Sequence, residues 1–178
     1  MRIDKATMGD APQIQDLVSS FAAIGEMLPR PLAEIYEHLR DFFVVREDGK
    51  VVGAAALHVM WEDLAEVRSL AVVENNQDQG MGLLLVNACL DEARRLGIRT
   101  VFALTQQPAF FEKIGFHQAD MMTLPRKVWG ECFRCPKFPN CDEIAVIIDL
   151  GEATPDRGKQ DDTPAGRLGH GNWASSSM

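Results

Sequence analysis

Two glycines, Gly80 and Gly82, lie where a run of strand-forming residues gives way to a long apolar helical pattern. Because the helix would begin at Gly80, its unpaired N–H groups and its positive end would point at the preceding loop, as suits a phosphate. Without β-carbons, the two glycines would let a pyrophosphate approach the backbone closely. The spacing is neither a P-loop nor the G-x-G-x-x-G of dinucleotide folds, and such glycines also occur in ordinary turns. The candidate anion-binding loop comprises Gln77, Asp78, Gln79, Gly80, Met81 and Gly82.

A carboxylate and a guanidinium lie two residues apart in the strand-like segment before this loop. Alternation along residues 64–73 predicts Glu66, Arg68 and Leu70 on one face, with the odd-numbered residues on the other. Glu66 could accept a proton from an ammonium group, directly or through water, and Arg68 could bind a ligand carboxylate through two hydrogen bonds. The alternative is that the two side chains only form an ion pair with each other.

Three cysteines, Cys132, Cys135 and Cys141, lie within ten residues of one another. They could hold zinc if a fourth ligand came from elsewhere, such as His117, Asp142 or a partner chain. A disulfide or redox pair, and reduced structural thiols, are the alternatives that remain open.

Hydrophobic periodicity predicts the elements that position these residues. Helices are expected at residues 11–24, 32–39, 80–96 and 109–114, and Asp10 is expected to cap the first of them. Strands are expected at 42–46 and 50–59, joined by a turn at Asp48-Gly49, and then at 64–73, 100–105, 116 onward and 143–149. Helices before an antiparallel middle and a strand-helix-strand end predict a mixed α/β (α+β) sheet.

The composition favours one domain and a small-molecule partner. A chain of 178 residues that is 46% hydrophobic can bury one core, which we expect at residues 1–150. Residues 151–178 are rich in Gly, Pro, Asp and Ser and are expected to form a flexible tail. A formal net charge of -8 disfavours nucleic acid and anionic lipid as partners. No secretory signal or membrane span is evident, so we expect a cytoplasmic protein; a homodimer is a further candidate assembly.

From residue 1 to about residue 150 the chain resembles the GNAT family of N-acetyltransferases. The family's Q/R-x-x-G-x-G/A motif is matched by Gln77, Gly80 and Gly82, and its Phe-Glu-Lys-x-Gly-Phe signature is present at residues 111–116. The resemblance implies a mostly antiparallel central sheet flanked by helices, with acetyl-CoA as the cosubstrate. It also implies that backbone groups of the strand before the loop, at Leu70, Ala71 and Val72, meet the pantetheine arm.

Three segments, residues 28–30, 64–72 and 132–143, look like those of the short, single-domain N-acetylglutamate synthases. That resemblance implies transfer of acetyl to the α-amino group of L-glutamate, which opens arginine biosynthesis, with Glu66 as the base. Arg30, Arg68 and Lys127 are the implied partners of the two substrate carboxylates, although Arg30 and Lys127 could equally be solvated loop charges.

The chain departs from the family pattern at two positions. Asp78 places a carboxylate where a basic residue or glycine is usual, and Phe111 replaces the tyrosine that often protonates the departing thiolate. The only tyrosine is Tyr36, expected to be packed in the second helix. The general acid is therefore unassigned. Another small amine as acceptor, or a module that senses acetyl-CoA or a metal without turnover, are the alternative functions.

Overall fold

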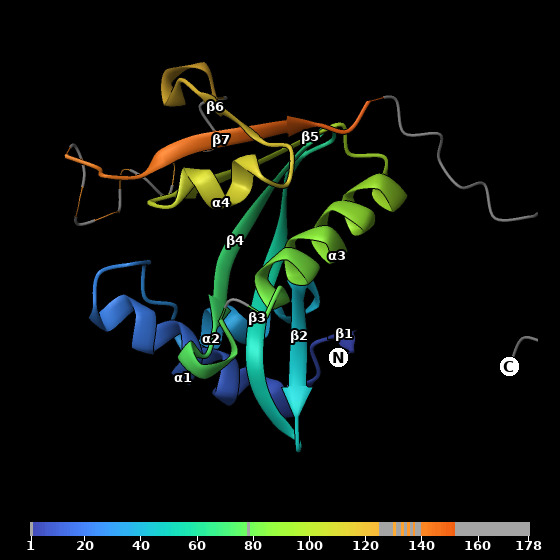
Figure 1. Cartoon of the computed structure of the whole chain (residues 1–178), viewed down its shortest axis with the longest axis vertical. Coiled ribbons are helices and arrows are strands. Elements are labelled where there is room, and N and C mark those ends of the chain that lie inside the picture. The colour runs from blue at the N-terminus through green and yellow to red at the C-terminus, as the bar shows by residue number, and fades with distance from the viewer. Residues whose placement is uncertain are drawn as a thin grey trace, which may run out of the picture.

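The computed structural model of the chain describes residues 2–77, 79–124, 130, 133, 135, 137 and 140–151. Asp78, Lys127, Cys132 and the predicted tail beyond Gly151 lie outside these ranges. The strands are β1 (Ile3–Lys5), β2 (Phe42–Glu47), β3 (Lys50–Trp61), β4 (Leu64–Val72), β5 (Thr100–Thr105), β6 (His117–Ala119) and β7 (Ile144–Asp149). The α-helices are α1 (Ala11–Ala23), α2 (Leu32–Glu37), α3 (Met81–Leu96) and α4 (Pro108–Glu112), as Figure 1 labels them. Four short 3-10 turns are η1 (Met8–Asp10), η2 (Leu39–Asp41), η3 (Glu74–Asn76) and η4 (Met121–Thr123).

The described strands form one mixed, mostly antiparallel sheet, which confirms the predicted fold class. Their order is β1-β2-β3-β4-β5-β7-β6. Within it β4 and β5 run parallel, while the other neighbouring strands run antiparallel. The crossover between the two parallel strands contains α3, as a parallel connection requires. Strand β1 is too short to show a pattern in the sequence and was missed.

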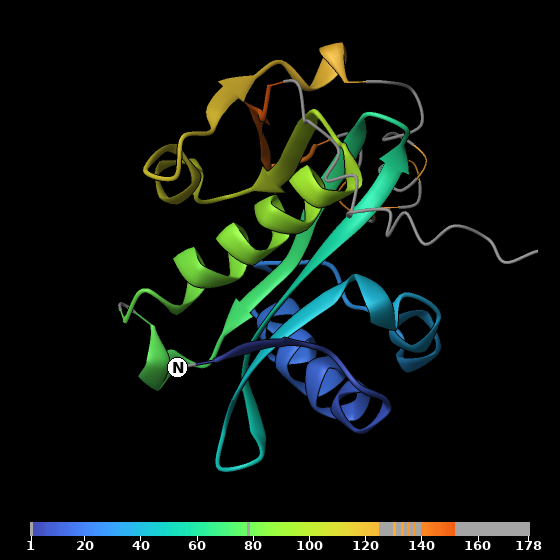
Figure 2. The ribbon, with the colours of Figure 1, turned by 90° about the vertical axis from the view of Figure 1, so that its right-hand side faces the viewer.

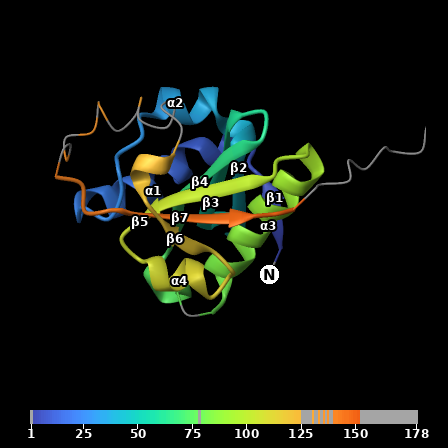
Figure 3. The ribbon, with the colours of Figure 1, turned by 90° about the horizontal axis from the view of Figure 1, so that it is seen from above.

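Helices cover both faces of the sheet (Figure 3). Helix α3 lies on one side of β3 and β4, and α1 lies on the other (Figure 2). Under α3, side chains such as Leu85, Val86 and Leu90 pack on Ala65 and Val67 of β4. Beneath α1 and α2, the core includes Ile14, Val18, Ile35, Ala56 and Ala71. The two cores hold β4 between them, so each face of this strand meets a different part of the molecule.

A bulge in β4 makes one prediction about its faces wrong. Between the pairs Ala54↔Ala71 and Ala56↔Arg68, β3 advances two residues and β4 three, and Ser69 adopts φ 54°. The extra residue reverses the alternation, because a bulge shifts all later side chains to the opposite face. Arg68 therefore lies opposite Ala56 on the side of α1 and α2, whereas Leu70 packs in the core under α3.

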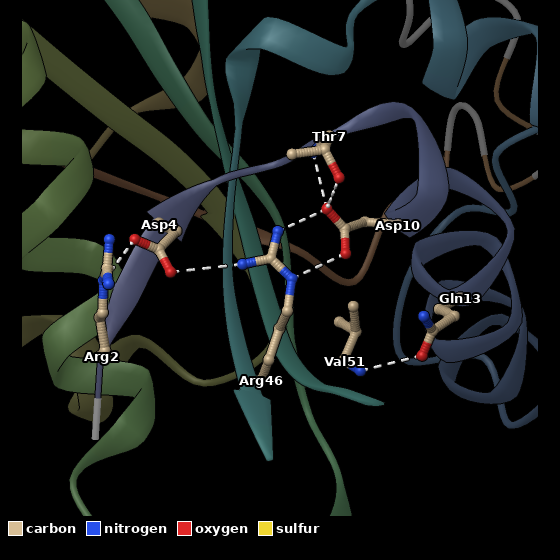
Figure 4. Close-up of polar contacts among 7 residues, drawn as sticks. All are labelled: Arg2, Asp4, Thr7, Asp10, Gln13, Arg46 and Val51. Atoms are coloured by element: carbon tan, nitrogen blue, oxygen red, sulfur yellow. Dashed lines mark hydrogen bonds and ion pairs between the residues drawn. The ribbon is translucent and has the colours of Figure 1, made fainter. Parts of the chain in front are cut away.

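A charged network fixes the start of α1 (Figure 4). Arg46 of β2 donates to both carboxylate oxygens of Asp10, at 2.8 and 2.5 Å, and to Asp4 at 3.3 Å. Thr7 donates its backbone N–H and its hydroxyl to the same carboxylate. Asp10 was expected to cap α1, but its side chain makes no cap hydrogen bond there. The carboxylate joins β2 to the segment between β1 and α1 instead, and the hydrogen bond from Arg46 holds the pKa of Asp10 well below its usual range.

The other predicted helices and strands are present, with ends within a few residues of those expected. Predicted helix 32–39 divides into α2 and η2, because the α-helical bonding stops at Glu37. Within the described residues, no helix combines the length and the apolar character needed to cross a membrane.

Candidate functional site

A large cleft opens where β4 and β5 move apart. The two strands pair through only three positions, Leu64↔Thr100, Ala65↔Val101 and Glu66↔Phe102. Beyond Phe102, β5 remains paired with β7, whereas β4 runs on to Val72 without it. The space between them, closed on one side by the α1–α2 loop, has a volume of about 1500 Å³. The edge of β4 that faces this space keeps backbone groups that β5 does not pair, so an extended ligand could bond there.

The candidate anion-binding loop lies at one end of this cleft, with Gly80 and Gly82 in its lining. Gly80 adopts φ 76° directly before α3, a conformation that residues with a β-carbon rarely adopt. A β-carbon at Gly82 would lie 3.2 Å from Cζ of Phe110, so this glycine also lets α3 pack against α4. The first helical bond runs from the N–H of Leu84 to the carbonyl of Gly80, and the earlier N–H groups face the loop. This geometry suits an anion.

The side chain of Gln77 makes a hydrogen bond within the protein that the sequence motif did not predict. Its side-chain amide donates to the carbonyl of Val72 at 3.1 Å and thereby fastens the loop to the end of β4. Gln79 makes a similar bond to the carbonyl of Asn75. Met81 is the first residue of α3, and because its side chain is buried it could offer a ligand only its backbone. Asp78, the unfavourable charge of the motif, lies outside the described residues.

The side chains of Leu70, Ala71 and Val72 differ in whether they line the cleft. Leu70 and Val72 line the cleft, while the side chain of Ala71 is buried in the core beneath α1. Ala71 could therefore meet a ligand only through its backbone. The roles of these three residues toward a pantetheine arm stay predictions.

Glu66, Arg68 and Arg30 all line the same cleft. Glu66 is partly buried and Arg68 is buried, both on the α1/α2 side of β4. Arg30, from the loop before α2, pairs with the carboxylate of Glu34. Arg30, Glu34 and Arg68 also line a small adjoining pocket, so both arginines border the same space. Lys127, the third predicted partner, lies outside the described residues.

Phe111 is buried and packs edge-to-face against Phe110 and Phe116, with ring centroids 5.2 Å apart in each pair. It lines the cleft and carries no hydroxyl that could protonate a leaving group. Tyr36 is 39% exposed on α2, so the expectation that it is packed was wrong. Tyr36 is not among the described residues that line the cleft.

Cys135 and Cys141 also line the cleft, and both are free thiols. The thiol of Cys141 lies 3.9 Å from the carboxylate of Glu143, whose own pKa burial raises. Zinc at the three cysteines stays a prediction, because Cys132 lies outside the described residues. Cys89 is fully buried, which raises the pKa of its thiol to about 12.

Lys137 and Asp142 contact elements beside the cleft. Lys137 donates to Asp142 at 2.8 Å and to the carbonyl of Gly25 at 3.1 Å. Gln106, just after β5, donates to the same carboxylate at 2.7 Å. Lys137 is thereby tied to the α1–α2 loop, and Asp142 to the residue that follows β5.

Sequence reasoning missed a cluster of His38, Asp41 and His58 beside this site. His58 lies directly across from Glu66 in the register of β3 and β4, and His38 lines the small pocket that contains Arg68. The three residues are spread over twenty positions and three elements. Their spacing carries no signal, and only the fold brings them together.

Comparisons with known proteins identify the family and relatives of this chain. Residues 13–116 match the family described as the acetyltransferase (GNAT) family. An uncharacterised N-acetyltransferase of Chlorobaculum tepidum is 38% identical over 83% of this chain and 96% of its own length. An amino-acid acetyltransferase of Mycobacterium tuberculosis is 35% identical over 86% of this chain and 87% of its own. N-acetylglutamate synthase of Neisseria gonorrhoeae, solved with coenzyme A and N-acetyl-glutamate, superposes with a TM-score of 0.77 at 28% identity. That likeness covers 84% of this chain and 35% of the larger one.

Proposed function

The chain belongs to the acetyltransferase (GNAT) family, and on that premise we propose that it transfers acetyl from acetyl-CoA to the α-amino group of L-glutamate. The observation that carries the choice of acceptor is that Arg30, Arg68 and Glu66 all line one cleft. Glutamate has two carboxylates and one amine, and this set offers two guanidinium groups and one base. The names of the mycobacterial and gonococcal relatives point to the same class of acceptor.

The arginines are suited to binding because of where each is held. Arg68 is buried, which fixes its guanidinium and strengthens its attraction for a carboxylate. Arg30 already pairs with Glu34, but a guanidinium has five N–H donors and can bond a second carboxylate. We assign one substrate carboxylate to each arginine.

The Glu66 carboxylate would take the proton that the substrate ammonium must lose before it can attack a thioester. Glu66 precedes the divergence of the strands, so it would lie at the inner end of the acceptor site. The proton would pass to it directly or through one water. In this way the chain would hold the acceptor by its carboxylates and generate the neutral amine at the place of reaction.

Acetyl-CoA fits the remainder of the cleft and supplies the acetyl group as a thioester. The N–H groups at the start of α3 and the open backbone of Gly80 and Gly82 would hold its pyrophosphate. The edge of β4 that β5 does not cover would bond its pantetheine arm, with Leu70 and Val72 beside it. Phe111 cannot donate a proton, so the departing thiolate would take one from water.

Release of thiol from acetyl-CoA, measured across a panel of amino acids, tests the acceptor. The panel should contain L-glutamate, L-glutamine, L-aspartate and D-glutamate, which vary the second carboxylate, its reach and the stereochemistry. We expect kcat/KM for L-glutamate to exceed that for L-glutamine by about tenfold or more. The neutral amide of glutamine would leave one guanidinium without a charged partner. Equal values for the two would overturn glutamate as the acceptor.

A second outcome of this experiment would contradict the proposal that the chain is an enzyme. Thermal stabilisation by acetyl-CoA without thiol release for any amine would mark the chain as a binding module instead of an enzyme.

A further inference from the structure

His38, Asp41 and His58 bring three ligand atoms together at one place between α2 and the sheet. The Nδ1 atom of His58 lies 2.8 Å from Oδ2 of Asp41, and Nδ1 of His38 lies 3.7 Å from the same oxygen. One ligand atom from each residue lies within 4.8 Å of the other two. Among the described residues, this is the group of histidine, cysteine and acidic side chains with that property.

The Nδ1 atom of His58 and the Asp41 carboxylate form a hydrogen bond, and the same separations also suit atoms that share a metal ion. Bonds of about 2.0–2.2 Å to a zinc-like cation place two ligand atoms roughly 3.3 Å apart in a tetrahedron and roughly 2.9 Å apart at a right angle. The observed distances of 2.8 and 3.7 Å bracket these values. Two imidazoles and one carboxylate also form a ligand set that divalent transition metals bind, with positions left for water.

The rings are oriented so that they do not block each other. They meet edge-to-face at 89°, with centroids 5.0 Å apart. All three side chains are partly exposed, His38 at 37%, Asp41 at 24% and His58 at 21%, so an ion could reach them from solvent.

The named neighbouring charges balance one another. Glu66 faces His58 across the β3–β4 ladder, and Arg30, Glu34 and Arg68 share a pocket with His38. Two carboxylates thus stand beside two guanidinium groups. The negative charge that would attract a cation is that of Asp41 itself.

We propose that His38, Asp41 and His58 form a binding site for a divalent transition-metal cation such as Zn²⁺ or Co²⁺. The site is separate from the predicted cysteine site and needs no part of the proposed acetyl transfer. Because His38 and Asp41 follow α2 while His58 belongs to β3, a bound ion would fasten the α2–η2 segment to the sheet.

Titration of the untagged, chelator-treated protein with Co²⁺ tests the proposal through its visible spectrum. We expect a single ion per chain with bands typical of nitrogen and oxygen ligands and no sulfur-to-cobalt charge-transfer band. His38→Ala and His58→Ala should each weaken Co²⁺ binding by roughly 100-fold. Asp91→Ala, which removes an exposed carboxylate on α3, should leave the affinity unchanged.

The cysteines provide the decisive control. Replacement of Cys132, Cys135 and Cys141 together by Ser should leave the cobalt spectrum and affinity as they are. Loss of cobalt binding in that variant, or unchanged binding in both His38→Ala and His58→Ala, would overturn the proposal. If a histidine variant fails to fold, the ligand bands of the wild-type protein decide between the two sites on their own.

Discussion

Glu66 and Phe102 are the last residues at which β4 and β5 face each other in register. Phe102 is fully buried and packs beside Leu64 on the same side of the sheet as Glu66, while β5 beyond it stays with β7. Glu66 therefore lies at the inner end of the space between the diverging strands. An amine that reached this end would meet a carboxylate held by the sheet instead of one on a loop.

Substitution of that carboxylate should separate chemistry from binding. In Glu66→Gln the side chain keeps its size but can no longer accept a proton, so we expect kcat to fall by about 100-fold or more. Affinity for acetyl-CoA should change little, because the loop at Gln77–Gly82 lies at the other end of the cleft. Steady-state kinetics and calorimetric titration with CoA measure the two quantities.

A second substitution provides the control. Glu66→Asp keeps a carboxylate that can accept a proton, so it should retain more activity than Glu66→Gln. If Glu66→Gln has wild-type kcat, Glu66 takes no part in the reaction.

Removal of either arginine should act on the acceptor. Arg68→Gln and Arg30→Gln each delete one charge-assisted pair, so the KM for glutamate should rise by roughly tenfold or more. The KM for acetyl-CoA should stay near the wild-type value. Arg95→Gln, which removes an arginine 63% exposed on α3, is the matched control and should change neither constant. A proportionate rise in both KM values would indicate a disturbed fold instead of a lost carboxylate contact.

The sequence predicted the parts of the site that depend on local chemistry. A strand, a glycine loop and a helix in succession were enough to predict the local structure around the candidate anion-binding loop, because each has a strong signal of its own. The face on which Leu70 lies was predicted wrongly, because the alternation of side chains in the sequence does not reveal the bulge at Ser69. The His38–Asp41–His58 cluster was missed because it depends on the packing of η2 against β3. Asp10 was expected to cap a helix, but Arg46, thirty-six positions away, binds its carboxylate instead.

Substitutions at the two glycines should have different costs. Gly80→Ala forces a β-carbon into a backbone with φ 76°, at a cost of about 1 kcal/mol, although nothing lies within 4 Å of the added atom. We expect a modest loss of stability and a several-fold rise in the KM for acetyl-CoA. Gly82→Ala also presses on Phe110, so its effect on thermal stability reports on the contact between α3 and α4. Unchanged KM for acetyl-CoA in both variants would argue against a pyrophosphate at this loop.

Asp10 and Arg46 predict how the fold responds to acid. Because the folded-state pKa of Asp10 lies well below its ordinary value, about 3.9, its contribution to stability is fully present above that pH and is lost as the pH falls through and below it. Asp10→Asn should lower the free energy of unfolding at pH 7 by about 1–3 kcal/mol, since it weakens two bonds from Arg46 in a buried setting. The gap between wild type and variant should narrow as the pH approaches 3. Urea unfolding across this range measures it, with Asp16→Asn, an exposed aspartate on the same helix, as the control. If the difference in the free energy of unfolding stays constant from pH 7 to pH 3, the ionised Asp10–Arg46 pair is not the source of the stability that Asp10 provides.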